Sequence, residues 1–275
     1  MKKLIIILLL ITHLFSCQEV VDVDLKTAQE RLVIEALINW ENGTTGNEQT
    51  IKLTKTSSFY NNQIIPATGA AVVIENIDSQ EVFNFNETSN GIYQTTTFVP
   101  ILNNAYKLQI TYENESYKAI STLLPSPPII EVTQSIEGGF SVDEPEVNIS
   151  FQDFIGQDDY YRITFSQFRP SINQEIETSI YTYDSRFESD NVLSDYFESE
   201  DLLAGDSFDI TIYSIPKPFF NFLEKLENQS EESDGPFSSP PINVKGNIVN
   251  TTNKAKYPYG YFNLHEVSKT SYIFN

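Results

Sequence analysis

Few residues of this chain could carry acid–base or nucleophilic chemistry. The 275 residues include two histidines and one cysteine. His13 lies in an N-terminal segment that we expect to be removed, which leaves His265 as the only imidazole of the mature chain. A Ser–His–acid site would have to use His265, which lies in a predicted terminal strand over residues 262–267. We expect a structural strand histidine there, and the counts exclude cysteine catalysis and cysteine-based zinc sites. We therefore expect a protein that is not an enzyme.

The 38 acidic residues leave two kinds of site open. Glycosidases need two carboxylates about 5–9.5 Å apart, a distance that a sequence cannot establish, so a carboxylate-based secreted hydrolase is the weakest alternative. Calcium prefers several oxygen ligands on a loop, and Asp153, Asp158 and Asp159 flank a glycine-containing turn. These three are the candidate calcium ligands, against the default of an acidic face that keeps the protein soluble. No other cofactor is expected, because no glycine-rich phosphate-binding motif occurs.

The 15 tyrosines and 19 phenylalanines indicate aromatic-rich cores. The alternative is that some tyrosines line a surface groove, since tyrosine is favoured at interfaces. Tyr257, Tyr259 and Tyr261 alternate with a proline and a glycine, so on a strand all three would face one side. They are the candidate ligand-binding residues.

The N-terminus has the pattern of a bacterial lipoprotein signal. Lys2 and Lys3 precede an apolar run over residues 4–11, which is shorter than the roughly 18 apolar residues of a membrane-spanning helix. Residues 14–17 (LFSC) resemble the lipobox, in which a diacylglycerol is attached to the cysteine and cleavage occurs just before it. The sequence thus predicts a signal peptide over residues 1–16 and lipidation at Cys17. The alternative is an ordinary signal whose cysteine happens to lie near the cleavage site.

The net charge of the chain indicates what could hold such a protein at a membrane. Removing residues 1–16 takes away two lysines and no acid, so the net charge of −21 becomes −23. Such a chain does not bind a nucleic-acid backbone, where Lys and Arg must supply the attraction. Anionic headgroups also repel it, so lipid chains, each CH₂ contributing about 0.8 kcal/mol, must do the anchoring. The acids that follow Cys17 (Glu19, Asp22 and Asp24) resemble the acidic leader of surface-exposed lipoproteins in Bacteroidota-type bacteria. This resemblance implies an outer-membrane protein, anchored through its N-terminal lipid and exposed at the cell surface.

The mature chain divides into two β-rich parts. Residues 17–30 are an acidic tether, and residues 31–124 contain short apolar runs separated by Asn, Gly and Asp turns. This spacing predicts an immunoglobulin-like β-sandwich. Its predicted strands are residues 32–38, 50–56, 70–74, 82–85, 92–98, 105–112 and 116–123.

A proline-rich linker over residues 125–128 marks the predicted boundary, because proline cannot donate ladder hydrogen bonds. Residues 129–275 read as a second β-rich, fibronectin-like domain with helical insertions. One helix is expected near residues 195–203 and a second near residues 217–229, where apolar residues follow the i, i+3, i+4, i+7 rule. The predicted fold class is mainly β, with two β-sandwich modules.

Four stretches resemble a family of uncharacterised outer-membrane lipoproteins of Bacteroidota-type bacteria, known only as a domain of unknown function. They are residues 32–36 (LVIEA), 68–74 (TGAAVVI), 91–93 (GIY) with 106–110 (YKLQI), and 240–248 with 260–262 (PP, GNI and GYF). Members are often encoded beside TonB-dependent receptors, the gated barrels that import nutrients. The resemblance implies an accessory to such a transporter, and it supplies no catalytic residues.

Three functions are therefore weighed. The leading hypothesis is a non-enzymatic binding or accessory subunit of a TonB-dependent transporter. The alternative is an adhesin or structural surface spacer built from tandem modules. A secreted hydrolase is the third.

Overall fold

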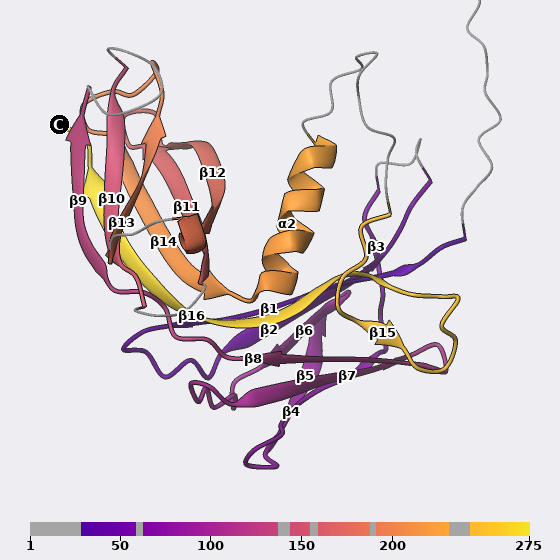
Figure 1. Ribbon diagram of the computed structural model, residues 1–275. Coiled ribbons are helices and arrows are strands. Elements are labelled where there is room, and N and C mark those ends of the chain that lie inside the picture. Colours follow the sequence, from indigo (N-terminus) through magenta and orange to yellow (C-terminus); the bar gives the residue numbers. More distant parts are fainter. Residues whose placement is uncertain (1–28, 59–62, 137–143, 155–158, 188–190, 231–242) are drawn as a thin grey trace, which may run out of the picture.

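The computed structural model describes residues 29–58, 63–136, 144–154, 159–187, 191–230 and 243–275 (Figure 1). Within these ranges the chain forms sixteen β-strands and one α-helix, so the predicted mainly-β fold class is confirmed. The strands build two β-sandwich modules, and the last strand belongs to both.

The first module has two layers that share one strand. One layer has the order β16-β1-β2-β6-β5 and the other the order β5-β4-β7-β8-β15, because β5 pairs with β6 in one layer and with β4 in the other. A short strand, β3, pairs with β2. The strands are β1 (Leu32–Glu41), β2 (Gln49–Lys55), β3 (Ile65–Pro66), β4 (Ala71–Asn76), β5 (Val82–Ser89), β6 (Ile92–Thr95), β7 (Ala105–Tyr112), β8 (Glu115–Thr122) and β15 (Val249–Asn250).

Alternation along these strands places apolar side chains between the two layers. In β7, Tyr106, Leu108 and Ile110 are buried, while the residues between them are partly exposed. Strand β1 follows the same two-residue period, with Ile34 and Ile38 fully buried. This is the pattern of strands that bury one face, and it explains why short apolar runs in the sequence predict this module well.

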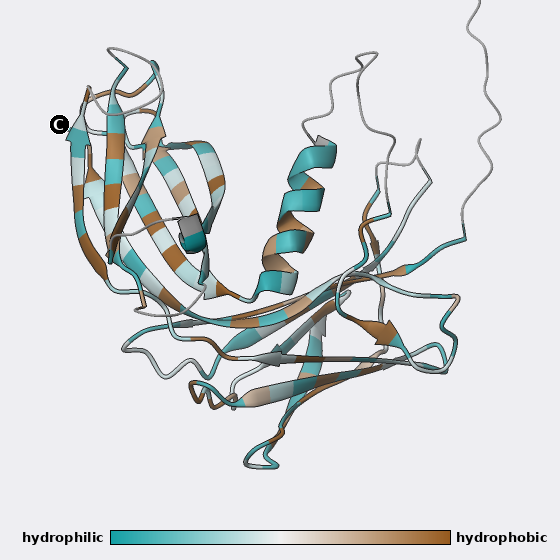
Figure 2. Cartoon of the chain, in the orientation of Figure 1, coloured by the Kyte–Doolittle hydropathy of each residue, from teal (hydrophilic) through white to brown (hydrophobic). Residues whose placement is uncertain are grey.

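The second module packs a four-stranded layer, β12-β11-β14-β16, against a three-stranded layer, β13-β10-β9. Bands of hydrophobic and hydrophilic residues alternate along these strands (Figure 2), and their inward side chains form a second core rich in Phe, Tyr and Ile. Its elements are β9 (Ile129–Ser135), β10 (Glu146–Gln152), β11 (Tyr160–Arg169), β12 (Gln174–Asp184), the 3₁₀ turn η2 (Ser185–Phe187), β13 (Val192–Glu198) and β14 (Ser207–Ile215).

Strand β16 (Tyr259–Ile273) joins the modules. Its residues 259–267 run parallel to β1, and its residues 268–273 run antiparallel to β14. Figure 1 shows it as one long yellow strand that passes beneath the helix and climbs into the second module. Because the backbone ladder is continuous through β16, the two modules are not joined by the proline-rich linker alone.

Helix α2 (Lys217–Ser230) packs where the modules meet. Its Phe219, Phe222 and Leu223 contact a third apolar cluster, to which β11, β14 and β16 contribute, among others, Tyr213 and Tyr261. Phe219 is 1% exposed, and burying such a side chain stabilises the fold by about 2–3 kcal/mol. The predicted helix near residues 217–229 is confirmed.

The helix predicted near residues 195–203 is wrong, because residues 192–198 form strand β13. Leu193 and Phe197 are buried in the second core, and β13 pairs antiparallel with β10. Of the four acids in residues 195–203, Asp195 and Glu198 lie on partly buried positions of this strand, and Glu200 and Asp201 follow it. Pairing with β10 overrides the local preference of a short segment.

The division at residues 125–128 does not describe how the sheets are built. Strand β15 and residues 259–267 of β16 pair with strands of the first module, although they follow the linker in sequence. The linker itself is packed: Ser126 is 8% exposed and Pro127 is buried.

Candidate functional site

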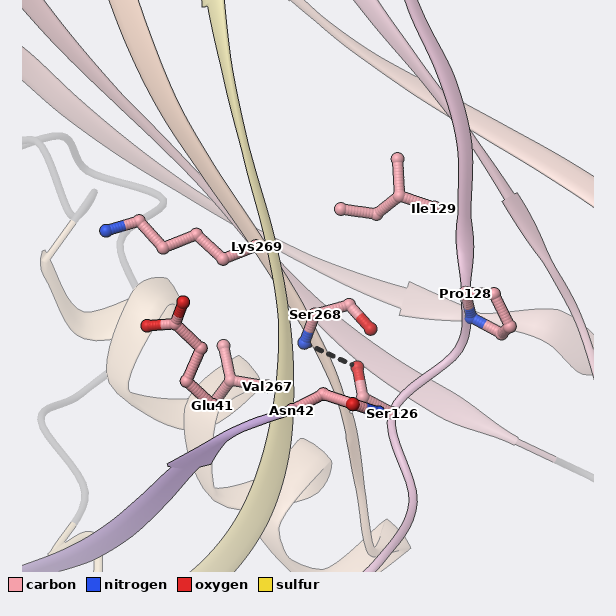
Figure 3. A pocket seen from close by; sticks show the side chains of 8 residues that line it. All are labelled: Glu41, Asn42, Ser126, Pro128, Ile129, Val267, Ser268 and Lys269. Atoms are coloured by element: carbon pink, nitrogen blue, oxygen red, sulfur yellow. Dashed lines mark hydrogen bonds between the residues drawn. The ribbon is translucent and has the colours of Figure 1, made fainter. Parts of the chain in front are cut away.

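A pocket of about 300 Å³, lined by polar and apolar residues alike, lies where β1 ends and β16 passes from one module to the other. In Figure 3, Glu41 and Lys269 extend on one side of β16, and Pro128 and Ile129 lie on the other. We call this the junction pocket. It is lined by Glu41, Asn42, Ser126, Pro128, Ile129, Val267, Ser268 and Lys269.

The carboxylate of Glu266 organises the backbone beside this pocket. It accepts hydrogen bonds from Asn42 Nδ2 at 3.0 Å and from the Ser126 backbone N–H at 2.9 Å. The Ser126 hydroxyl donates to the Ile212 carbonyl at 2.7 Å and accepts from the Ser268 N–H at 3.0 Å. The end of β1, the linker, β14 and β16 are therefore tied together at one point.

The junction pocket can bind but is not arranged for nucleophilic chemistry. The Ser126 hydroxyl in this pocket is buried. It already donates a hydrogen bond to one backbone group and accepts one from another. Activation of a serine needs a base within hydrogen-bond reach, and His265 does not line the pocket.

His265 is enclosed at the module junction. It is 0% exposed, and its ring lies 4.4 Å from Tyr213 and 5.8 Å from Phe219, centroid to centroid. Its Nδ1 lies 3.3 Å from the Ser214 carbonyl oxygen and 3.4 Å from Asn263 Nδ2. Burial lowers the pKa of His265 to about 3, and the nearby charge of Arg162 acts in the same direction. This confirms neither catalysis nor metal binding; it describes a core histidine held neutral.

Asp195 is the carboxyl group whose environment most resembles that of a general acid. Burial raises its pKa to about 6, and a hydrogen bond from the Tyr196 N–H at 2.8 Å opposes the rise. A general acid works best with a pKa near the working pH. A glycosidase would also need a second carboxylate about 5–9.5 Å away across a cleft.

The predicted calcium ligands are only partly described. Asp153 accepts a hydrogen bond from the Tyr161 hydroxyl, and Asp159 donates its backbone N–H to Ser185 Oγ at 3.2 Å. Asp158 lies outside the described residues, so this site stays a prediction. In the described part of the chain, no group of three or more His, Cys, Asp or Glu side chains is placed to hold a metal ion.

The structure brings two of the three predicted tyrosines together. The rings of Tyr257 and Tyr259 meet edge to face at 5.7 Å and are half-buried at the start of β16. Tyr261 is 6% exposed and packs against Phe219 and Phe222 of α2 at 4.5 and 4.8 Å. It belongs to the core at the junction, so it is not available to a surface ligand.

Residues that the sequence analysis did not identify contact Tyr257 and Tyr259. The Arg31 guanidinium lies 3.8 Å from the centroid of the Tyr257 ring, and Lys245 Nζ lies 3.9 Å from it. The Tyr259 hydroxyl donates to Asn243 Oδ1 at 3.2 Å. Arg31 and Tyr257 are 226 positions apart, so no local pattern in the sequence could have linked them.

Cys17 lies outside the described residues, so its predicted lipidation stays a prediction. In the described ranges, no helix is both long enough and apolar enough to span a membrane.

The comparison with protein families decides the classification. A family model described as "Domain of unknown function (DUF4249)" matches residues 18–271. The chain belongs to this family. The DUF4249 match begins one residue after Cys17 and covers both modules, and it confirms the predicted membership of a domain-of-unknown-function family. Among curated proteins, no match to this DUF4249 chain is found.

Similar solved structures are remote from this DUF4249 chain. A DUF4785 family protein from Legionella pneumophila is 10% identical with a TM-score of 0.31, over 66% of this chain and 52% of that one. The FN1–FN3 domains of chicken CNTN1 are 12% identical with a TM-score of 0.27, over 66% of this chain and 57% of that one. The DUF4249 chain thus spans little more than half the length of these proteins. At such TM-scores the likeness carries no argument about function.

Proposed function

We propose that this DUF4249 chain is a lipid-anchored outer-membrane protein at the cell surface. In this proposal it acts as a non-enzymatic binding or accessory subunit of a TonB-dependent transporter. Cys17 carries the lipid, and the two-module body is the part that meets a ligand or the barrel.

Enclosure of His265 is the observation that carries the non-enzymatic part of this proposal. His265 is the only histidine after residue 13, and it is 0% exposed at the junction core. The only cysteine lies at the predicted lipidation position. The side chains most often used as bases and nucleophiles are thus either enclosed or committed to the anchor.

Rigidity supports the accessory role. Strand β16 is continuous through both modules, and Glu266 and Ser126 tie the linker to it. A body that does not bend at its centre presents its surfaces in one fixed arrangement, which lowers the entropy lost when it docks on a large partner. The choice of a TonB-dependent barrel as that partner rests on the family resemblance.

Co-purification tests the proposal. The native protein is extracted from membranes in mild detergent with an affinity tag at its C-terminus, and the proteins that accompany it are identified. We expect a TonB-dependent receptor barrel in near-equal amount, and its loss when Cys17→Ser removes the anchor. Reproducible recovery of the tagged protein without any barrel contradicts the transporter role.

A structural surface spacer is the second candidate, and the shared strand β16 favours it too, because a spacer must resist bending. A spacer needs no transporter and has no reason to be encoded beside a receptor gene. The same co-purification separates the two, since a spacer is recovered without a barrel.

A further inference from the structure

One surface of the first module combines cations with tyrosines, and we call it the tether-edge patch: Arg31, Lys245, Lys254, Tyr257 and Tyr259. Arg31 and Lys245 both lie within 4 Å of the Tyr257 ring centroid, at 3.8 and 3.9 Å. Arg31 Nη1 also donates to the carbonyls of Ala255 and Tyr257, each at 3.1 Å. These bonds fix the turn that carries Lys254 against the start of β1.

No ion pair among the described residues includes a cation of the patch. Within the described residues, ion pairs occupy seven other Lys and Arg side chains, whereas Arg31, Lys245 and Lys254 form none. Lys256 on the same turn pairs with Glu115 at 2.9 Å, and Glu30 precedes Arg31 as the nearest acid in sequence. Removing residues 1–16 changes the formal charge from −21 to −23. In so acidic a chain, a group of three cations around two tyrosines needs a reason.

The position of the patch supplies that reason. Arg31 directly precedes β1, and only residues 17–30 separate it from Cys17. Such a segment reaches at most about 50 Å when fully extended, and about 20 Å as a flexible coil. In Figure 1, β1 begins at the end of the molecule opposite to the C-terminus, so the patch and the second module lie at opposite ends.

We propose that the tether-edge patch is the membrane-facing surface of the protein and binds the phosphate groups of anionic lipid headgroups. This inference rests on the anchoring in the proposed function. Each Lys or Arg near an anionic surface contributes about fivefold to binding, and tyrosine is favoured at the level of the headgroups. The acidic remainder of the body is repelled by the same headgroups. Attraction at one end and repulsion elsewhere together orient the second module away from the bilayer.

The test uses an anchor that does not depend on natural acylation, so that its failure is distinct from a failure of the proposed function. The chain from residue 17 is coupled through its single thiol to a maleimide lipid in vesicles. One set of vesicles contains phosphatidylglycerol, and the other contains phosphatidylcholine alone. Mass spectrometry then follows the acetylation rate of individual lysines by a water-soluble reagent.

On the anionic vesicles, Lys245 and Lys254 are expected to react at least fivefold more slowly than on the neutral ones, and 0.5 M salt should remove the difference. Lys217 is the internal control, because it also lies over a tyrosine ring, 5.9 Å from the centroid of Tyr160, and forms no ion pair in the described part of the chain. Its rate is expected to be the same on both vesicles.

A matched pair of variants completes the test. Lys254→Gln should weaken the protection of Lys245 about fivefold, whereas Lys217→Gln, which removes the same charge elsewhere, should leave it unchanged. Equal rates for Lys245 on both vesicles overturn the proposal. The proposal is also overturned if Lys245 is acetylated just as slowly in the uncoupled chain without vesicles. The protection would then come from the acidic tether, residues 17–30, and not from the lipid.

Discussion

The carboxylate of Glu266 accepts a hydrogen bond from the backbone N–H of Ser126 at 2.9 Å, across 140 positions of sequence. Glu266 lies on β16 and is 5% exposed, while Ser126 lies in the proline-rich linker. This contact closes the junction between the modules. It turns a segment that reads as a spacer into part of a packed interface.

Glu266→Leu is therefore expected to destabilise both modules together. The change leaves the buried Ser126 N–H and the Asn42 amide without their charged acceptor, which costs about 2–4 kcal/mol. Unfolding in urea, followed by the fluorescence of Trp40 in the first module and by far-ultraviolet circular dichroism, should show one transition at a lower midpoint. Two separate transitions, with that of the second module unchanged, would contradict a mechanical link through Glu266.

Gly260 is expected to be irreplaceable in β16. Its φ is +95°, and a Cβ there would lie 2.0 Å from the Ile34 carbonyl oxygen of the paired strand β1. Gly260→Ala should therefore cost more than the roughly 1–2 kcal/mol of left-handed backbone strain alone. Gly43→Ala is the control, because Gly43 has a φ of +85° with no atom within 4 Å of its Cβ position. If both variants lose equal stability in thermal unfolding, close contact with β1 is not the reason for the glycine.

Asp206 is expected to be the most sensitive acid of the second module. It is 1% exposed, and both of its carboxylate oxygens accept hydrogen bonds from Arg169, at 2.9 and 2.8 Å, while the Gln167 amide donates at 2.7 Å. These donors hold the pKa of Asp206 below its ordinary value. Asp206→Ala leaves Arg169 unpaired and should cost about 3–5 kcal/mol.

Asp209→Ala is the matched control for that change. Asp209 is more than half exposed and faces Lys269 at 3.7 Å, so its loss should cost less than about 1 kcal/mol. Chemical denaturation of both variants decides the question, and a small loss for Asp206→Ala would show that the buried pair is not needed.

His265 should make the protein less stable in mild acid. Its pKa is about 3 in the folded chain and near 6.5 in the unfolded chain, so only the unfolded chain takes up this proton as the pH falls below 6.5. The free energy of unfolding then falls by up to about 1.4 kcal/mol per pH unit until the folded pKa is reached. In His265→Gln this contribution disappears, and between pH 8 and pH 5 its stability should fall about 2 kcal/mol less than that of the native chain. Parallel pH profiles of the two proteins would show that His265 is not held neutral.

The sequence predicted the strands well because their signal is local. Alternating burial in β1 and β7, and the apolar stripe of α2, depend on residues that are neighbours along the chain. The failure at residues 195–203 came from a short segment with as many acids as apolar residues, where pairing of β13 with β10 decides the structure.

The junction between the two modules could not be predicted from residues that are neighbours along the chain. That β16 serves two modules depends on pairing with β1 and β14, which lie far away in sequence. The separation of Tyr261 from Tyr257 and Tyr259 follows from packing against α2. For the same reason the sequence identified the tyrosines of the tether-edge patch but not Arg31 and Lys245 beside them.

The most direct test of the lipid-anchored account is the mass of the N-terminal peptide of the mature protein, purified from native membranes and digested. The account predicts a peptide that begins at Cys17 and carries a diacylglycerol on its sulfur. A peptide that begins at another residue, or at an unmodified Cys17, would contradict it.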